Sequence, residues 1–126
     1  ITEAIRLKLP NTMLIRGVNA QVTKDLDAVS KATELFDAVL LDSFVEGRYG
    51  GTGVVHDWEL SKRVKQAVQP KPLILAGGLN PENVAEAVRT VEPYAVDVSS
   101  GVEQQPRVKS HQKIVEFIKN AKDVKT

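Results

Sequence analysis

The stretch Ala95-Val-Asp-Val-Ser-Ser-Gly-Val-Glu103 decides the predicted fold of this 126-residue chain. Its first residues alternate, with Ala95, Asp97 and Ser99 on one face and the two intervening valines on the other. Alternation with a period of two predicts a β-strand. The valine face can pack beneath helices, whereas the other face carries a carboxylate and a hydroxyl. We therefore expect a strand whose tip, Ser99-Ser100-Gly101, offers hydroxyls and backbone N–H groups to an anion, usually phosphate.

A second stretch, Pro72-Leu-Ile-Leu-Ala-Gly-Gly-Leu79, has the same design. It predicts a buried strand that ends in two glycines, followed by a helix start at Asn80-Pro-Glu-Asn. Glycines let backbone N–H groups approach a phosphate with no Cβ in the way. We predict that the two tips form one phosphate site. The alternative is two tight turns that need glycine only for a positive φ. The predicted site residues are Gly77, Gly78, Ser99 and Ser100.

The other apolar runs alternate between helical and strand spacing, which predicts four parallel strands separated by helices. Such an order fits either an open doubly wound sheet or about half of a (β/α)₈ barrel, since a closed barrel needs at least about 200 residues. The expected elements are a helix over 1–9, a strand over 12–18, a helix over 24–35, a strand over 36–42, a glycine-rich loop over 43–55, a helix over 58–68 after an Asp57 cap, a strand over 73–76, a helix from Pro81, a strand from Ala95 and a last helix capped by Ser110.

The composition excludes several classes of function. The chain is 42% hydrophobic and 26% charged, with a net charge of +1, so it can bury a core but has no basic excess for nucleic acid or anionic membranes. No apolar run reaches the length of a membrane span. The absence of cysteine excludes disulfides, thiolate metal sites and a cysteine nucleophile or base within these residues. His56 and His111 lack the spacing of metal ligands, so we expect no metal and no cofactor. Without a membrane span or a signal-peptide pattern, we expect a cytoplasmic enzyme.

Two aspartates and one loop are further candidates. Asp42 ends an apolar strand, where a carboxylate is either catalytic or a cap on the following turn. Asp97 would meet either a buried ion-pair partner, for which Arg16 is available, or a ribose hydroxyl. The loop over 47–53 has four glycines and is longer than a usual βα turn. It is either a lid over a site or a plain surface loop.

Several runs, in order and at similar spacing, resemble the phosphoribosylanthranilate isomerase family. The resemblance covers the whole chain but only the second half of the family's barrel, from the end of helix four through helix eight. It implies a (β/α)₈ TIM barrel of which residues 1–126, as a single domain, supply about the second half. The runs are Leu40-Leu-Asp-Ser43, Gly50-Gly-Thr-Gly53, Asp57-Trp58, Leu75-Ala-Gly-Gly-Leu-Asn-Pro-Glu-Asn-Val84 and Val96-Asp-Val-Ser-Ser-Gly-Val-Glu103.

The resemblance also implies an activity and roles for residues. The reaction is the Amadori rearrangement of N-(5-phosphoribosyl)anthranilate to 1-(2-carboxyphenylamino)-1-deoxyribulose 5-phosphate in tryptophan biosynthesis. Asp42 falls on the general acid that protonates the ribose ring oxygen, and Asp97 on a carboxylate that meets the sugar hydroxyls. The predicted phosphate residues fall in the family's phosphate grip. Gly51 and Thr52 complete the substrate-binding set.

The resemblance also bears on what the chain lacks and on its partners. The family's general base, a cysteine, and its anthranilate-binding arginine both lie in the first half of the barrel. We therefore expect the isolated chain to be inactive. The strands that contain Met13 and Ala95 would expose open edges, which favours pairing with an N-terminal half-barrel or self-association. The alternatives are another phosphate-binding barrel enzyme, of the pentose-phosphate epimerase or thiamine-phosphate synthase type, or a non-catalytic half-barrel fragment.

Overall fold

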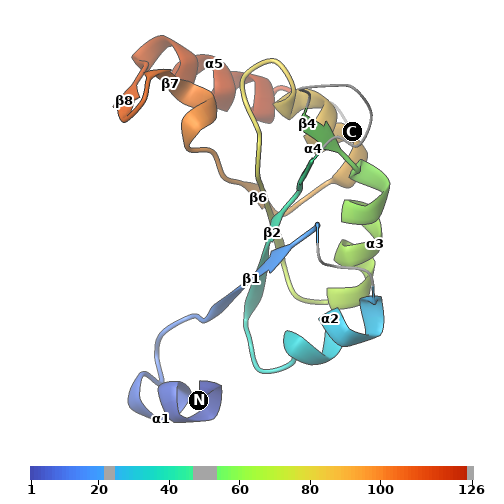
Figure 1. Ribbon diagram of the computed structural model, residues 1–126. Coiled ribbons are helices and arrows are strands. Elements are labelled where there is room, and N and C mark those ends of the chain that lie inside the picture. The colour runs from blue at the N-terminus through green and yellow to red at the C-terminus, as the bar shows by residue number, and fades with distance from the viewer. Residues whose placement is uncertain (22–24, 47–53, 125–126) are drawn as a thin grey trace.

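A four-stranded parallel sheet forms the centre of the computed structural model, which describes residues 1–21, 25–46 and 54–124 (Figure 1). Its strands are β1 (Ile15–Asn19), β2 (Ala38–Asp42), β5 (Leu73–Ala76) and β6 (Ala95–Val96), in the order β1-β2-β5-β6. The predicted parallel sheet is thus confirmed, with β1 and β6 at its edges. Several boundaries differ from the predicted ones. The first two strands begin at Ile15 and Ala38 rather than at residues 12 and 36, and β6 ends at Val96, so Asp97 lies beyond the strand.

Helices cover one face of this sheet, as Figure 1 shows for α2 and α3. The helices α2 (Leu26–Ala32), α3 (Trp58–Val68), α4 (Val84–Val91) and α5 (His111–Lys122) pack against one another in chain order. The residues of the two central strands that face these helices, Val39 and Leu41 in β2 and Leu73 and Leu75 in β5, are fully buried, which explains the apolar runs of these strands. The core contains Val39, Leu41, Val64, Val68, Leu73, Leu75, Leu79, Val84, Ala87 and Phe117, with Val96, Val98 and Trp58 packed against it.

The opposite face of the sheet is more open. Ile15 is 46% exposed, and Leu40 and Ile74 are only half-buried. These residues share a face because the register pairs Ile15 with Ala38 and Leu40 with Ile74. In a closed barrel, this face would line the interior.

The helix starts follow from their capping residues. The Asp57 carboxylate accepts the N–H of Leu60 at 2.9 Å, and the Ser110 hydroxyl accepts the N–H of Lys113 at 3.2 Å, as both predicted caps require. The helix expected from Pro81, α4, has its regular part from Val84. The turn before it is capped by Asn80, whose Oδ1 accepts the N–H groups of Glu82 and Asn83 and whose carbonyl accepts the N–H of Val84 at 3.1 Å.

Two short hairpins interrupt segments that we predicted as loop. The strands β3 (Phe44–Glu46) and β4 (Val54–His56) pair antiparallel, so the expected loop over 43–55 contains a hairpin stem. The turn η1 (Ser100–Val102) and the strands β7 (Glu103–Gln105) and β8 (Val108–Lys109) follow β6. The glycine-rich segment 47–53 lies outside the described residues.

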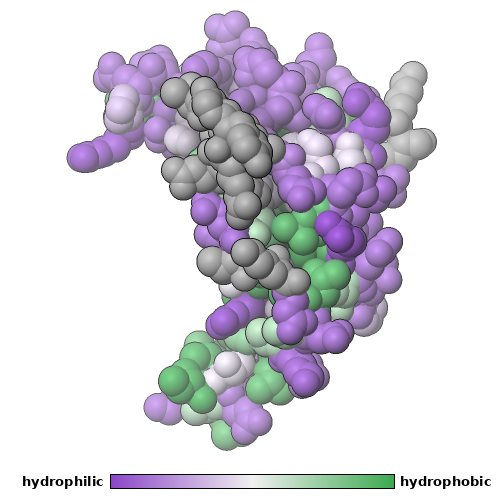
Figure 2. All heavy atoms as spheres, turned by 45° about the vertical axis from the view of Figure 1, so that its right-hand side comes forward, coloured by the Kyte–Doolittle hydropathy of each residue, from purple (hydrophilic) through white to green (hydrophobic). Residues whose placement is uncertain are grey.

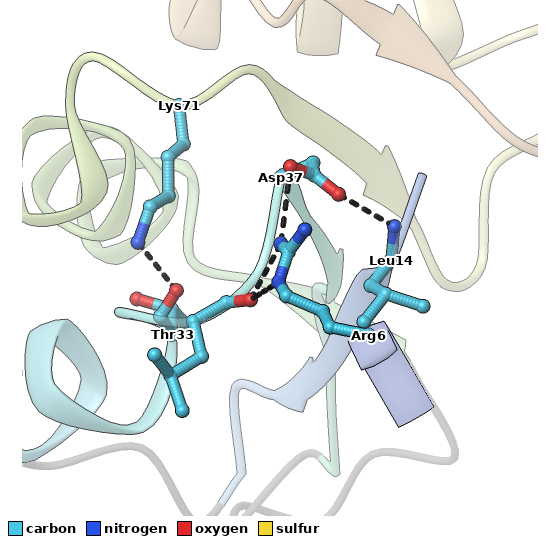
Figure 3. Close-up of polar contacts among 6 residues, drawn as sticks. Arg6, Leu14, Thr33, Asp37 and Lys71 are labelled. Atoms are coloured by element: carbon cyan, nitrogen blue, oxygen red, sulfur yellow. Dashed lines mark hydrogen bonds and ion pairs between the residues drawn. The ribbon is translucent and has the colours of Figure 1, made fainter. Parts of the chain in front are cut away.

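A polar cluster fastens the first helix, α1 (Thr2–Lys8), at the amino-terminal end of the sheet (Figure 3). No residue of α1 is buried. Arg6 donates to the Leu35 carbonyl at 2.6 and 2.8 Å and pairs with the Asp37 carboxylate at 3.1 Å. Asp37 also accepts the N–H of Leu14 at 2.8 Å, and this bond together with Arg6 lowers its pKa below the usual value. The helix is therefore held by charge and hydrogen bonds rather than by buried apolar surface.

Candidate active site

Asp42, the last residue of β2, lies at the carboxyl-terminal end of the sheet and is half-buried. Its Oδ1 accepts the N–H of Phe44 at 3.1 Å, so the alternative role as a cap on the following turn is present in the structure. This bond does not exclude a proton-donating role, because a carboxyl group has two oxygens. It fixes the orientation of the group at the strand tip.

Gly77 gives the Asp42 carboxylate its space. A Cβ built on Gly77 would lie 2.0 Å from Asp42 Oδ1 and 2.8 Å from the backbone nitrogens of Ser43 and Phe44. Gly77 and Gly78 also have φ values of 91° and 65°, which side-chain-bearing residues rarely adopt. Glycine is thus required here for two reasons. Both residues have a positive φ, as predicted, and at Gly77 a side chain would also clash with the Asp42 carboxylate. The tip after β5 and the tip after β2 form one contiguous structure.

Side chains from three other segments hold the carbonyls of the glycine tip. The buried hydroxyl of Ser43 donates to the Ala76 carbonyl at 2.7 Å and to the Gly77 carbonyl at 3.3 Å. His56 Nε2 lies 3.1 Å from the same Gly77 oxygen, and Asn83 Nδ2 donates to the Gly78 carbonyl at 3.0 Å. The Gly77–Gly78 peptide is trans. C=O and N–H point in opposite directions across a trans peptide. When side chains bind the Gly77 and Gly78 carbonyl oxygens, the N–H of the following residue therefore points away from those side chains.

The second predicted tip lies directly against the first. A Cβ on Gly101 would stand 1.8 Å from the Leu79 carbonyl oxygen, so Gly101 is in contact with the loop after β5. Ser99 and Ser100 are exposed at this tip. Lys109 reaches back from β8 and donates to the Ser99 carbonyl at 2.8 Å and its hydroxyl at 3.3 Å. The structure therefore brings the glycine tip and the serine tip together and adds a cation.

Asp97 lies beside this tip but not with the expected partner. It is exposed, and its N–H continues the ladder by donating to the Leu75 carbonyl at 2.9 Å. The prediction that Arg16 could pair with a buried Asp97 was wrong. Arg16 belongs to the opposite edge strand, in register with the buried Val39, and its guanidinium lies 5.8 Å from the Phe36 ring centre. The two residues thus lie at opposite edges and on opposite faces of the sheet.

Some functional candidates escaped the sequence analysis, and others cannot be placed. Ser43 and Lys109 had no assigned part, and His56 was set aside because its spacing does not suit a metal. Trp58 lies two residues after His56 but already belongs to α3, so strand periodicity could not have indicated their stacking. Gly51 and Thr52 lie outside the described residues. Within the described ranges, no group of three or more His, Cys, Asp and Glu residues could hold a metal ion.

The arrangement is a carboxylate beside a glycine tip whose carbonyls are bound by side chains, at the carboxyl-terminal edge of a parallel sheet. Ligands bind at this edge in α/β proteins. The family model of N-(5'-phosphoribosyl)anthranilate isomerase matches residues 3–120. The chain belongs to this isomerase family. No helix in the part of the chain that the structure describes has the length and apolar character needed to cross a membrane.

Relatives of this family show which part of the length is present. The isomerase of Methanosarcina acetivorans is 52% identical over 103 residues, covering 80% of this chain and 42% of the relative. That of Methanocella arvoryzae is 40% identical over 121 residues, covering 96% and 56%. The chain thus spans about half the length of the curated relatives it matches.

Solved structures of isomerases agree with the fold. The phosphoribosylanthranilate isomerase of Thermotoga maritima superposes with a TM-score of 0.76 at 40% identity, covering 97% of this chain and 57% of that one. A second isomerase structure, in complex with reduced 1-(o-carboxyphenylamino)-1-deoxyribulose 5-phosphate, gives 0.73 at 37% identity, covering 97% and 55%. The four βα units therefore follow the TIM-barrel architecture of this family.

Proposed function

We propose that this chain supplies about the second half of a (β/α)₈ barrel that isomerises N-(5'-phosphoribosyl)anthranilate by an Amadori rearrangement in tryptophan biosynthesis. The observation that carries the proposal is the Asp42 carboxylate held against Gly77 at the carboxyl-terminal edge of the sheet. A cytoplasmic location belongs to the same proposal.

The proposed catalytic step uses Asp42 as general acid. Opening the ribose ring requires a proton on the ring oxygen as its bond to carbon breaks, and a positioned carboxylic acid can supply it. Asp97 is proposed to meet the sugar hydroxyls. Asp97 is exposed, so its carboxylate is accessible to a substrate, as this role requires and a buried ion pair would not allow.

The proposed phosphate grip combines Gly77, Gly78, Ser99 and Ser100, with Gly51 and Thr52 as further substrate contacts. It is supported by the contact of Gly101 with Leu79, which joins the two tips. It is also supported by the hydrogen bonds of His56 and Asn83 to the carbonyls of the glycine tip, which direct the following N–H groups away from these side chains. A fixed phosphate would hold the sugar near Asp42, and remote binding energy of this kind lowers the barrier to reaction.

The surface of the chain supports a need for a covering partner. Figure 2 shows apolar atoms gathered at the end of the molecule that carries α1. The exposed apolar side chains of this region include Ile1, Ile5, Leu7, Leu9, Met13, Ile15 and Leu35. Exposed patches and unpaired strand edges favour association. We propose that an N-terminal half-barrel covers them, and that the chain alone self-associates and has no isomerase activity.

A chimaera tests the proposed activity. Residues 1–126 replace the matched region of the Methanocella arvoryzae isomerase, which aligns with 96% of this chain and whose remaining residues supply the rest of the barrel. The chimaera is expected to isomerise N-(5'-phosphoribosyl)anthranilate, whereas the chain alone is not. A folded but inactive chimaera would contradict the proposed function. Light scattering on the lone chain tests association, and a well-behaved monomer would contradict that part.

A further inference from the structure

His56, at the end of β4, is clamped between an aromatic ring and the glycine tip. Its ring stacks on Trp58 with centroids 4.4 Å apart and planes 8° from parallel. Its Nε2 lies 3.1 Å from the Gly77 carbonyl oxygen. Because a carbonyl can only accept a hydrogen bond, this contact requires the proton on Nε2. The stack and the hydrogen bond together fix the plane and the direction of the imidazole.

The hairpin β3–β4 delivers this ring to the tip. His56 pairs in register with Phe44, whose N–H is bound by Asp42 Oδ1. The same short stem therefore carries the contact to the candidate acid and the contact to the glycine tip. A change in the stem would move both.

The hydrogen bond of His56 has a defined consequence for the backbone. Gly77 has no Cβ, and glycine peptides rotate more freely than others. With the Gly77 oxygen bound by His56, the N–H of Gly78 must point away from the imidazole across the trans peptide. Ser43 donates to the same oxygen at 3.3 Å but is closer, at 2.7 Å, to the Ala76 oxygen. His56 is thus the nearer of the two side chains that hold this peptide plane.

We propose that His56 is a positioning residue, whose Nε2–H fixes the Gly77 carbonyl so that the Gly78 N–H faces the phosphate group of the substrate. This inference rests on the proposed function, since it names what orients the proposed phosphate grip. His56 does not touch the substrate and takes no proton from it. Its effect is on phosphate affinity, through the direction of one backbone donor.

Phosphate binding by the full chain tests this role. Inorganic phosphate is titrated into residues 1–126 while the Gly78 amide is followed by NMR. His56→Phe keeps a ring to stack on Trp58 but removes the N–H. It is expected to weaken phosphate binding roughly threefold to tenfold, the factor associated with one neutral hydrogen bond. His56→Gln, whose amide can donate from a similar position, is expected to restore most of the affinity.

The matched control is His111→Phe, the same exchange at the exposed first residue of α5. It is expected to leave phosphate binding unchanged. Equal affinity of His56→Phe and the wild type would overturn the inference, as would a failure of His56→Gln to exceed His56→Phe. A measurement without any variant adds a further test. Nitrogen NMR of the wild type should show His56 protonated on Nε2, and a bare Nε2 would overturn the proposal even if His56→Phe did not fold.

The chimaera separates this inference from the proposed function. In an active chimaera, His56→Phe should raise KM and leave kcat nearly unchanged, because the weakened phosphate contact is equally strong in the ground state and in the transition state. An inactive chimaera would refute the isomerase proposal, while the phosphate titration would still decide the part of His56. A wild-type chain whose Gly78 amide ignores phosphate would refute the phosphate grip and this inference together.

Discussion

An aspartate stands at each end of strand β2, and the two carboxylates have different surroundings. Asp37, just before the strand, accepts the Leu14 N–H and pairs with Arg6, and these contacts lower its pKa. Asp42, at the last residue, is held by the Phe44 N–H and has Gly77 beside it in place of a side chain. The amino-terminal carboxylate joins parts of the fold. The carboxyl-terminal one is held in a space kept open by glycine, which suits the proposed role of Asp42 as an acid.

The largest expected effect follows from exchanging each of these carboxylates for its amide. In the active chimaera, Asp42→Asn should lower kcat by about 10²- to 10⁴-fold with little change in KM, because an amide cannot supply the proton. Steady-state kinetics measure both constants. Asp37→Asn is the matched control and should leave kcat unchanged. An equal effect of the two variants on kcat would refute the assignment of the acid to the carboxyl-terminal end of β2.

Adding one methyl group at the carboxyl-terminal tip should cost stability. Gly77→Ala places a Cβ 2.0 Å from Asp42 Oδ1 and 2.8 Å from two backbone nitrogens, at a φ of 91°, and we expect a loss of about 2–4 kcal/mol in unfolding free energy. Urea denaturation of residues 1–126 measures it. Gly17→Ala is the control, since its Cβ would meet nothing within 4 Å and should change stability by less than about 0.5 kcal/mol. Equal stability of the two variants would refute the close packing at Gly77.

At the amino-terminal end, the expected effect depends on pH. The folded-state pKa of Asp37 is lowered, so its contribution to stability is complete above the unfolded pKa of about 3.9 and is lost as pH falls through the lower folded value. The wild type should therefore exceed Asp37→Asn in melting temperature near neutral pH, and the difference should shrink below about pH 4. Thermal melts across this range measure it. A difference that persists unchanged into stronger acid would show that the charge is not responsible.

The smallest effect is expected where the chain turns into β6. Glu92 ends α4 in the left-handed region at a φ of 51°, a conformation that glycine adopts without strain. Glu92→Gly should raise the unfolding free energy by about 0.5–1 kcal/mol. Glu86→Gly, within the same helix, should lower it by about 1 kcal/mol. Urea denaturation distinguishes the two signs, and a destabilised Glu92→Gly would contradict the strain.

The sequence predicted the sheet, its helices and the contact between the two tips, because these follow from apolar spacing and from glycines at strand ends. The hairpin stems were not predicted, since three-residue strands such as Phe44–Glu46 are too short to show a period. Arg16 was assigned to the wrong partner because strand order and face were not known. The contact between His56 and Gly77 joins residues 21 apart, and only the folded hairpin brings them together.

Gly77 constrains how this tip can evolve, because a Cβ there would lie 2.0 Å from Asp42 Oδ1 and 2.8 Å from the backbone nitrogens of Ser43 and Phe44. A change of Asp42 to a smaller residue would relieve only the first of these clashes. The two backbone contacts and the positive φ of Gly77 would still disfavour a side chain. A lineage that lost the acid is therefore expected to keep Gly77, and with it the space for a carboxylate. Loss of the acid would then stay reversible by a single exchange at residue 42.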